Sequence, residues 1–251
     1  MPVKVTINGT AHNTEKGEYL LAVLRRNKAL VPSLCHHEGL PGRASCRLCV
    51  VEVDEGGGSK VVNSCVYPVS RDCTVLTESD LIKRIRIQVL SMLRSRAPKD
   101  KRINSLCSMY KVPETKRYKP VKSGDCVLCG LCSQACAELG TGAISTMGRG
   151  TGKKVATPYD EPSVDCVGCA SCAAICPTGA ISCSEKKGAR TIWKKNFKLL
   201  RCESCQEYFA TKEEFEHARA RSQSTDTRVI CPECRKKKTS DVFASAFGER
   251  V

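Results

Sequence analysis

Residues 126–136 read CVLCGLCSQAC, and residues 166–176 read CVGCASCAAIC with the same spacing of four cysteines. The likeness continues beyond the cysteines, because the pentapeptide TGAIS at 141–145 returns at 178–182. Two copies of one small unit predict a domain built from two similar halves. This repeat decides how the middle of the chain folds.

The three closely spaced cysteines of each copy are the strongest signal for a metal cluster. Cysteines at i, i+3 and i+6 in a tight loop surround one [4Fe–4S] cubane, and a fourth, more distant cysteine completes the set. Zinc sites do not use this triple spacing, so zinc is the less favoured occupant.

The repeat resembles the two-cluster ferredoxins, in which the fourth cysteine of each copy ligates the other cluster. Pro177 matches the Cys-Pro of that family, whereas Ala137 departs from it. The resemblance implies two ligand sets: Cys126, Cys129, Cys132 and Cys176 for the first [4Fe–4S] cluster, and Cys136, Cys166, Cys169 and Cys172 for the second.

The composition is typical of several small modules stapled by metals. The chain has 251 residues, 19 cysteines, 5% aromatic residues and one tryptophan, too few large apolar rings for one big core. No run of about 18 apolar residues predicts a membrane span, and the N-terminus MPVKVTINGT lacks the apolar stretch of a secretion signal. We therefore expect a cytoplasmic protein whose cysteines bind metal rather than form disulfides.

The formal charge of +15 counts every cysteine as neutral. Metal-bound cysteine is a thiolate, and a four-cysteine cluster or zinc site carries a charge of about −2. Four such sites would lower the net charge to roughly +7. Much of the basic excess therefore offsets thiolate charge, which weakens an interpretation as a nucleic-acid-binding protein.

Residues 1–77 are predicted to form a small β-rich domain. Val3, Val5 and Ile7 alternate with polar residues, and the following Asn8-Gly9 is a strong hairpin signal. A short helix is expected near 20–24, with further strands at 50–53, 60–62 and 75–76. The cysteines follow the pattern C-x10-C-x2-C-x15-C and are Cys35, Cys46, Cys49 and Cys65.

This segment resembles the N-terminal [2Fe–2S] domain of the largest peripheral-arm subunit of respiratory complex I. The same domain opens the small iron–sulfur subunit of soluble NAD-linked hydrogenases, the iron-only hydrogenases and related subunits of electron-bifurcating hydrogenases. The resemblance is carried by Cys35, Cys46-Arg47-Leu48-Cys49, Val51-Glu52-Val53 and Ser64-Cys65. It implies a β-grasp fold with a [2Fe–2S] cluster on Cys35, Cys46, Cys49 and Cys65, although the first gap is longer than in plant-type ferredoxins.

Cys73 is a rival to Cys65 as the fourth ligand of this cluster; we favour Cys65, because the family pattern has a non-ligand at the later position. His36 and His37 adjoin Cys35 and are interpreted as solvent-facing residues or residues near the cluster sulfurs, rather than ligands. Cys107 and Cys183 are interpreted as buried, inert thiols.

Residues 78–120 are predicted to be a helical linker. A helix over 78–97 has an apolar stripe with basic residues on its other faces, and Pro98 ends it. The stripe comprises Leu81, Ile82, Ile85, Val89, Leu90 and Leu93, and the basic residues are Lys83, Arg84, Arg86, Arg94 and Arg96. The linker has no histidine and one cysteine, so it lacks the His-plus-three-Cys [4Fe–4S] site often found between these domains in the relatives.

Residues 193–240 contain two Cys-x-x-Cys pairs, CESC at 202–205 and CPEC at 231–234. Such pairs predict a zinc-ribbon-like module, in which zinc supplies folding energy. The ligands would be Cys202, Cys205, Cys231 and Cys234. A further iron–sulfur cluster is the alternative, and His217 is a weaker candidate ligand. The basic run 235–238 is interpreted as a solvated face rather than a nucleic-acid contact, and 241–251 as a short apolar tail, either docked, frayed or in contact with a partner.

These patterns predict an α+β chain: a β-grasp [2Fe–2S] domain at 1–77, a linker at 78–120, a two-[4Fe–4S] ferredoxin-like domain at 121–192, a zinc-ribbon-like module at 193–240 and a tail at 241–251. The residues after 185 match neither the catalytic domain of iron-only hydrogenases nor a molybdopterin domain, so we expect no substrate site in this chain. The resemblance implies a non-catalytic electron-transfer subunit between a flavin/NADH-binding subunit and a hydrogenase, including one that bifurcates electrons with ferredoxin.

Three other functions stay open. A formate dehydrogenase complex is the next candidate after a hydrogenase. An iron–sulfur subunit of a succinate dehydrogenase or fumarate reductase-like enzyme fits the length and the order of clusters, but the C-x10-C spacing argues against it. A nucleic-acid binder would need aromatic residues for base stacking, which are sparse near the ribbon; we expect no nucleic-acid partner and no membrane span.

Overall fold

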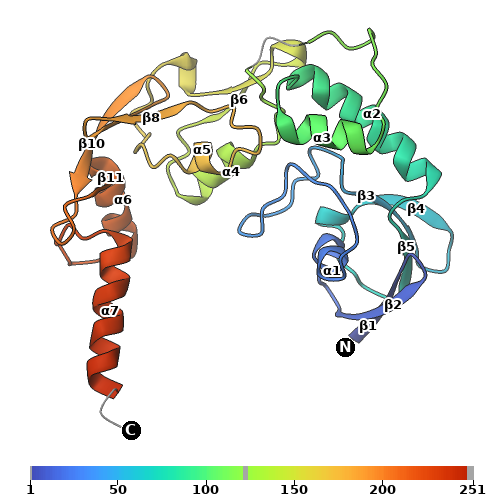
Figure 1. The fold of residues 1–251 in the computed structure, drawn as a ribbon, viewed down its shortest axis with the longest axis horizontal. Coiled ribbons are helices and arrows are strands. Elements are labelled where there is room, and N and C mark those ends of the chain that lie inside the picture. Colours follow the sequence, from blue (N-terminus) through green and yellow to red (C-terminus); the bar gives the residue numbers. More distant parts are fainter. Residues whose placement is uncertain (1, 121–123, 248–251) are drawn as a thin grey trace. The chain divides into compact units, whose positions relative to one another are not determined.

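The computed structural model describes residues 2–120 and 124–247 and divides into two compact units (Figure 1). Unit 1 comprises 1–135, 146–155 and 175–180; unit 2 comprises 136–145, 156–174 and 181–251. Helices and strands are mixed, in line with the predicted α+β class. The division does not follow the predicted boundaries near 121 and 193. It passes through the Cys-rich repeat, because 175–180 belongs with the first copy and 136–145 with the second.

The N-terminal part of unit 1 is a five-stranded mixed sheet with the order β2-β1-β5-β3-β4. β1 pairs with β5 in parallel, and the other neighbours are antiparallel. The strands are β1 Pro2–Ile7, β2 Thr10–Glu15, β3 Val50–Asp54, β4 Ser59–Asn63 and β5 Cys73–Leu76.

The first hairpin forms at the predicted turn. Ile7 pairs with Thr10, so Asn8 and Gly9 alone make the connection. Both have left-handed backbone, with φ of 47° and 92°, and this two-residue turn matches the right-handed twist of the strands. The Asn8 side chain also fixes the end of β5: its Oδ1 accepts from the Thr77 N–H at 3.0 Å.

Helix α1 Leu20–Arg26 packs against this sheet (Figure 1). Its apolar residues share one buried cluster with the alternating residues of β1, β3 and β5. The fully buried members include Leu20, Leu21, Val23, Leu24, Val5, Val51, Val53 and Val75. The alternation in the strands and the apolar run in the helix therefore build the core that the sequence predicts.

Two helices follow the sheet, α2 Asp80–Arg96 and α3 Lys101–Met109. Each begins at an acceptor side chain: Ser79 accepts from the Ile82 N–H, and Asp100 accepts from the Ile103 N–H, which satisfies a donor left open in the first turn. α2 ends before Pro98, as expected. A second apolar cluster joins α2 and α3 to residues around Leu34 and Leu48.

The buried face of α2 differs from the predicted stripe. Ile82, Leu90 and Leu93 are buried, whereas Leu81 is 41% exposed. Arg86, which the pattern predicts on the solvent side, is fully buried. Its Nε donates to the carbonyl oxygen of Leu48 at 3.1 Å, its Nη2 donates to that of Val50 at 2.9 Å, and its Nη1 pairs with Glu78 and with the Tyr110 hydroxyl. A hydrophobic pattern could not reveal this arginine, because its partners are backbone carbonyls distant in sequence.

The Cys-rich repeat has little regular structure. Its elements are α4 Leu131–Glu138 in the first copy, α5 Ser171–Ala174 in the second, and the paired short strands β6 Ser145–Met147 and β7 Lys154–Ala156 between them in sequence. Short 3-10 helices occur at Ser64–Val66, Gly150–Gly152 and Pro158–Asp160.

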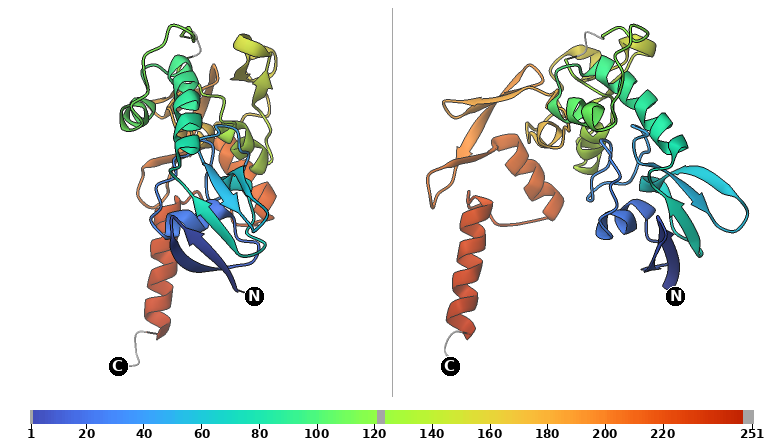
Figure 2. Two further views of the ribbon diagram at one scale, coloured as in Figure 1. Left: turned by 90° about the vertical axis from the view of Figure 1, so that its right-hand side faces the viewer. Right: turned by 45° about the vertical axis from the view of Figure 1, so that its right-hand side comes forward.

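The rest of unit 2 is a four-stranded antiparallel sheet with the order β11-β10-β9-β8, followed by two helices. The elements are β8 Cys183–Lys186, β9 Ala189–Ile192, β10 Lys195–Arg201, β11 Tyr208–Thr211, α6 Lys212–Ser222 and α7 Pro232–Phe247. Thr211 and Glu214 form a capping box at the start of α6. α7 extends away from the remainder of unit 2 in both views of Figure 2. No helix in the described ranges has the length and apolarity needed to cross a membrane.

We predict that Arg86→Met weakens the attachment of α2 to β3. The change leaves the carbonyls of Leu48 and Val50 without their donor, which costs about 3 kcal/mol. Hydrogen–deuterium exchange of peptides from α2 and β3 in the full chain should become roughly a hundredfold faster. Arg84→Met, at an exposed position of the same helix, is the matched control and should leave exchange unchanged; equal rates in the two variants would contradict the anchoring role.

Candidate metal centres

The four cysteines of the N-terminal domain lie together and are buried. Cys35, Cys46, Cys49 and Cys65 are between 0% and 7% exposed. The Cys46 N–H donates to Cys35 Sγ at 3.2 Å, and the Leu34 N–H donates to Cys46 Sγ at 3.4 Å. A further hydrogen bond, from the Cys46 thiol, is the main reason that the pKa of Cys35 lies far below its ordinary value. A thiolate stabilised by neighbouring donors is the form that binds metal.

The loop that carries these cysteines has an unusual backbone. Ala44 and Arg47 adopt left-handed conformations, with φ of 50° and 58°. Gly42 passes so close to the cysteine group that a Cβ there would stand 2.4 Å from the carbonyl oxygen of Cys65. Only glycine permits this approach, so the loop is shaped around the sulfur atoms.

Cys73, the rival of Cys65, lies apart from this group. It sits on β5 opposite Val5. Burial raises the pKa of Cys73, and its charged neighbours are Glu55, Asp72 and Lys60 rather than other cysteines. Cys65, in contrast, exchanges side-chain hydrogen bonds with Cys35 and Cys49. The geometry therefore brings Cys65, not Cys73, to the three other cysteines.

Unit 1 also contains the first set expected from the repeat, with Cys176 beside the first copy. Burial raises the pKa of Cys129 to about 11 and that of Cys132 to about 12, and the charge of Cys176 adds to both shifts. The Ala180 N–H donates to Cys176 Sγ at 3.3 Å. The raised pKa values keep these thiols protonated when no metal is bound, so metal binding would release their protons to solvent.

The first set adjoins the N-terminal cysteine group. Cys35, Cys46 and Cys129 belong to one buried cluster, together with Leu34, Leu48 and Leu131. Polar contacts join the same two loops: Ser45 Oγ donates to the carbonyl oxygen of Leu128 at 3.3 Å, and Gln134 Nε2 donates to that of Pro41 at 2.9 Å. The loop before β3 is therefore packed directly onto the first copy of the repeat.

Unit 2 contains the second set. Cys136, Cys166, Cys169 and Cys172 line one pocket, whose other walls are mainly apolar residues such as Ala143, Ile144, Ile192 and Trp193. Two side chains contact the sulfurs: Trp193 Nε1 donates to Cys172 Sγ at 3.4 Å, and the Thr141 hydroxyl lies 3.1 Å from Cys136 Sγ. A largely apolar pocket lined by four cysteines, with hydrogen-bonding partners at two of their sulfurs, fits an iron–sulfur cluster.

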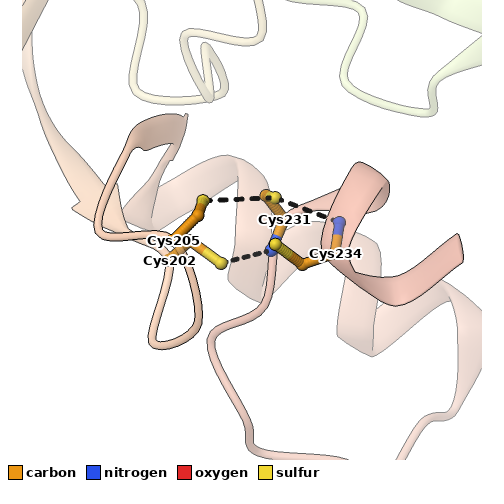
Figure 3. Close-up of side chains that lie close together, drawn as sticks. All are labelled: Cys202, Cys205, Cys231 and Cys234. Atoms are coloured by element: carbon orange, nitrogen blue, oxygen red, sulfur yellow. Dashed lines mark hydrogen bonds between the residues drawn. The ribbon is translucent and has the colours of Figure 1, made fainter. Parts of the chain in front are cut away.

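The four C-terminal cysteines lie close together (Figure 3). The sulfur atoms of Cys202, Cys205, Cys231 and Cys234 all lie within 4.8 Å of one another. The Cys231 N–H donates to Cys202 Sγ at 3.3 Å and holds the pKa of that thiol at about 6. The first pair turns between β10 and β11, and the second begins α7. Four sulfurs at this spacing fit one tetrahedral metal ion such as Zn²⁺.

The histidines and the remaining cysteines lie elsewhere. His217 Nε2 is 2.7 Å from the carbonyl oxygen of Leu139 and is not part of the C-terminal group. His36 Nδ1 lies 3.4 Å from Arg25, and His37 Nδ1 accepts from the Gly39 N–H. Cys107 on α3 is buried in the apolar cluster with α2, whereas Cys183 on β8 is only partly buried.

Cysteine spacing does not predict the contact of Trp193 with these centres. Trp193 lies 21 residues after Cys172, beyond the predicted end of the ferredoxin-like domain. The sequence holds one hint of this role. Trp193 is the only tryptophan of the chain, and it lies with two lysines at the turn between β9 and β10. The spacing of cysteines cannot predict a hydrogen-bond donor that lies on a hairpin later in the chain.

Comparison with known proteins supports a [2Fe–2S] domain at the N-terminus. Residues 1–80 match a family of 2Fe-2S iron-sulfur cluster binding domains. The chain is 30% identical over 208 residues to the NADP-reducing hydrogenase subunit HndD of Solidesulfovibrio fructosivorans, a match that covers 70% of this chain and 35% of the relative. It is 28% identical over 205 residues to an NADH-quinone oxidoreductase chain of Rhizobium meliloti (strain 1021), covering 71% of this chain and 24% of the relative.

A solved structure has a similar fold. A crystal structure of an NAD+-reducing [NiFe]-hydrogenase in the H2-reduced state aligns with a TM-score of 0.53 at 23% identity, covering 62% of this chain and 74% of that one. The match spans about a third of the hydrogenase subunit and about a quarter of the NADH-quinone oxidoreductase chain. These are the protein classes that the sequence resemblance named.

We predict that the fourth ligand of the N-terminal centre can be identified by two matched substitutions. Cys65→Ala should abolish the visible and electron paramagnetic resonance (EPR) spectrum of a [2Fe–2S] cluster, because it removes a sulfur from the group. Cys73→Ala removes a similarly buried sulfur and should keep the spectrum. The reverse pattern would show that Cys73, not Cys65, is the ligand.

Proposed function

We propose that this chain is an electron-transfer subunit with one [2Fe–2S] cluster, two [4Fe–4S] clusters and one zinc ion. It would connect a flavin-containing NAD(H) module to a catalytic module, most readily a hydrogenase. Each cluster, when bound, accepts and releases one electron at a time. We assign the N-terminal domain to the β-grasp fold, with Cys35, Cys46, Cys49 and Cys65 as ligands.

The repeat supplies the ligands of the two [4Fe–4S] clusters in this proposal. One set is Cys126, Cys129, Cys132 and Cys176, and the other is Cys136, Cys166, Cys169 and Cys172. The division into two units supports these sets, because each unit contains three cysteines of one copy and the fourth cysteine of the other copy. The chain's own residues would bury the sulfurs, exclude water and donate hydrogen bonds to them.

The observation that carries the electron-transfer role is the packing of the N-terminal cysteine group onto the first copy of the repeat. Cys35 and Cys129 share one apolar cluster, and the charge of Cys35 contributes to the raised pKa of Cys129. Two cysteine groups that share one apolar cluster would bring their metal centres close to each other. Such an arrangement suits passage of electrons rather than chemistry on a small molecule.

The C-terminal group is proposed to hold zinc in a structural role. The surrounding segment has a small core, in which Ile230 and the partly buried Phe209 pack against Cys202 and Cys231. So few apolar residues do not fold alone, and a tetrahedral zinc site would contribute the missing stability. A further iron–sulfur cluster on the same sulfurs is the alternative.

The relatives guide the choice of partners. Their names join a hydrogenase to NADP or NAD+, or NADH to a quinone. We therefore propose a pyridine-nucleotide-linked flavin subunit on one side and a hydrogenase on the other, with ferredoxin as a further partner if the complex bifurcates electrons. A formate dehydrogenase is the second candidate for the catalytic module.

Anaerobic purification of the native complex through this chain tests the partners. Mass spectrometry should identify a flavin- and NADH-binding subunit together with hydrogenase subunits. Recovery of the flavin subunit with another catalytic chain would keep the electron-transfer role and change the substrate. Recovery of this chain alone, or with nucleic acid, would contradict the proposal.

We predict that Cys132→Ser stops electron transfer through the native complex. NADH-dependent reduction of the terminal acceptor should fall at least a hundredfold, while NADH reduction of an artificial dye at the flavin subunit should remain. Cys107→Ser is the control, because Cys107 is buried near Leu90 and outside the proposed sets, and it should transfer electrons at the normal rate. Full turnover in the Cys132 variant would rule out this route.

A further inference from the structure

The turn between β9 and β10 has a sequence that does not suit its backbone. Ile192 pairs with Lys195, so Trp193 and Lys194 alone form the turn. Both residues have left-handed backbone, with φ of 51° and 61°. Such turns normally use Asn-Gly, because a bulky residue in this conformation costs on the order of 1–3 kcal/mol. Contacts outside the hairpin must therefore hold the turn.

Those contacts are made to the loop that carries the second cysteine set. Trp193 Nε1 donates to Cys172 Sγ at 3.4 Å. Lys195 Nζ donates to the carbonyl oxygens of Ser163 and Cys166 at 3.0 Å and 2.9 Å. Lys194 Nζ donates to the backbone of Asp160 at 2.7 Å. Three consecutive side chains thus fasten the turn to residues 160–172.

The indole is placed to act on the sulfur rather than merely to fill space. Trp193 lines the same apolar pocket as the four cysteines, and a hydrogen bond is stronger in such surroundings than in water. The corresponding cysteine of the first copy, Cys132, receives a backbone hydrogen bond from Ser133 instead. The donor to Cys172 is therefore a side chain that a substitution can remove.

We propose that Trp193 raises the reduction potential of the [4Fe–4S] cluster held by Cys136, Cys166, Cys169 and Cys172, an inference that rests on the proposed function. An N–H that donates to a ligand sulfur withdraws electron density from the iron atoms. It stabilises the reduced, more negative cluster more than the oxidised one. Trp193 is thus a positioning and tuning residue, which favours residence of the electron at the second cluster.

The test is Trp193→Phe in the full chain, purified anaerobically with its clusters. Phenylalanine keeps an aromatic ring in the pocket and removes the N–H donor. EPR-monitored redox titration should find the second [4Fe–4S] signal shifted to lower potential. At a fixed solution potential its reduced-to-oxidised ratio should fall about tenfold, which is 59 mV for a one-electron centre.

Two controls make the result specific. Cys169→Ser identifies the second cluster, because its EPR signal should be the one lost or altered. Tyr208→Phe removes the hydroxyl of an exposed aromatic residue on β11 and should leave all potentials unchanged. The [2Fe–2S] and first [4Fe–4S] signals serve as internal references within each sample.

The outcomes separate this inference from the proposed function. A shift confined to the second [4Fe–4S] signal supports the role of Trp193. An unchanged second signal, an upward shift, or equal shifts of all signals overturns it while leaving the three-cluster assignment intact. Absence of [4Fe–4S] signals from the unsubstituted chain overturns the proposed function, and the role of Trp193 with it.

Discussion

The fourth cysteine of each copy of the repeat lies in the unit that contains the other copy's first three cysteines. This exchange is the constraint on which the rest of the structure depends. Residues 175–180 of the second copy lie in unit 1, and 136–145 of the first copy lie in unit 2. Neither copy therefore has four cysteines in its own unit. If each set binds a cluster, both copies must fold before either unit is stabilised by metal ligation. The ligands then couple the N-terminal domain to the C-terminal module.

Residues 190–211, which run from β9 into the predicted C-terminal module, contact the cysteine loop of the second copy. The Thr211 hydroxyl donates to the carbonyl oxygen of Val167, and Arg190 Nη1 donates to that of Gly168 at 2.7 Å. A Cβ at Gly168 would stand 2.7 Å from the ring of Phe197, so glycine lets β10 approach the cysteine loop. Metal binding at the ribbon and order at the second cysteine set should therefore support each other.

The sequence predicted what local rules determine and missed what tertiary contacts determine. Cysteine spacing, the Asn8-Gly9 turn and the alternation in β1 depend on neighbours along the chain, and the hairpin and strand appear where expected. Arg86 and Trp193 were missed because their partners, Val50 and Cys172, are 36 and 21 residues away. The boundary expected near 193 falls inside the hairpin of β9 and β10. Side chains on both sides of that boundary contact the second cysteine loop, Arg190 before it and Lys195 after it.

The metal content of the full chain, purified anaerobically, tests the central claim most directly. One [2Fe–2S] cluster, two [4Fe–4S] clusters and one zinc site predict about ten iron atoms and about one zinc atom per chain. Elemental analysis normalised to protein concentration gives both numbers from one sample. Values near ten and one would support the account, whereas about two iron atoms per chain, with zinc in the cysteines of the repeat, would contradict it.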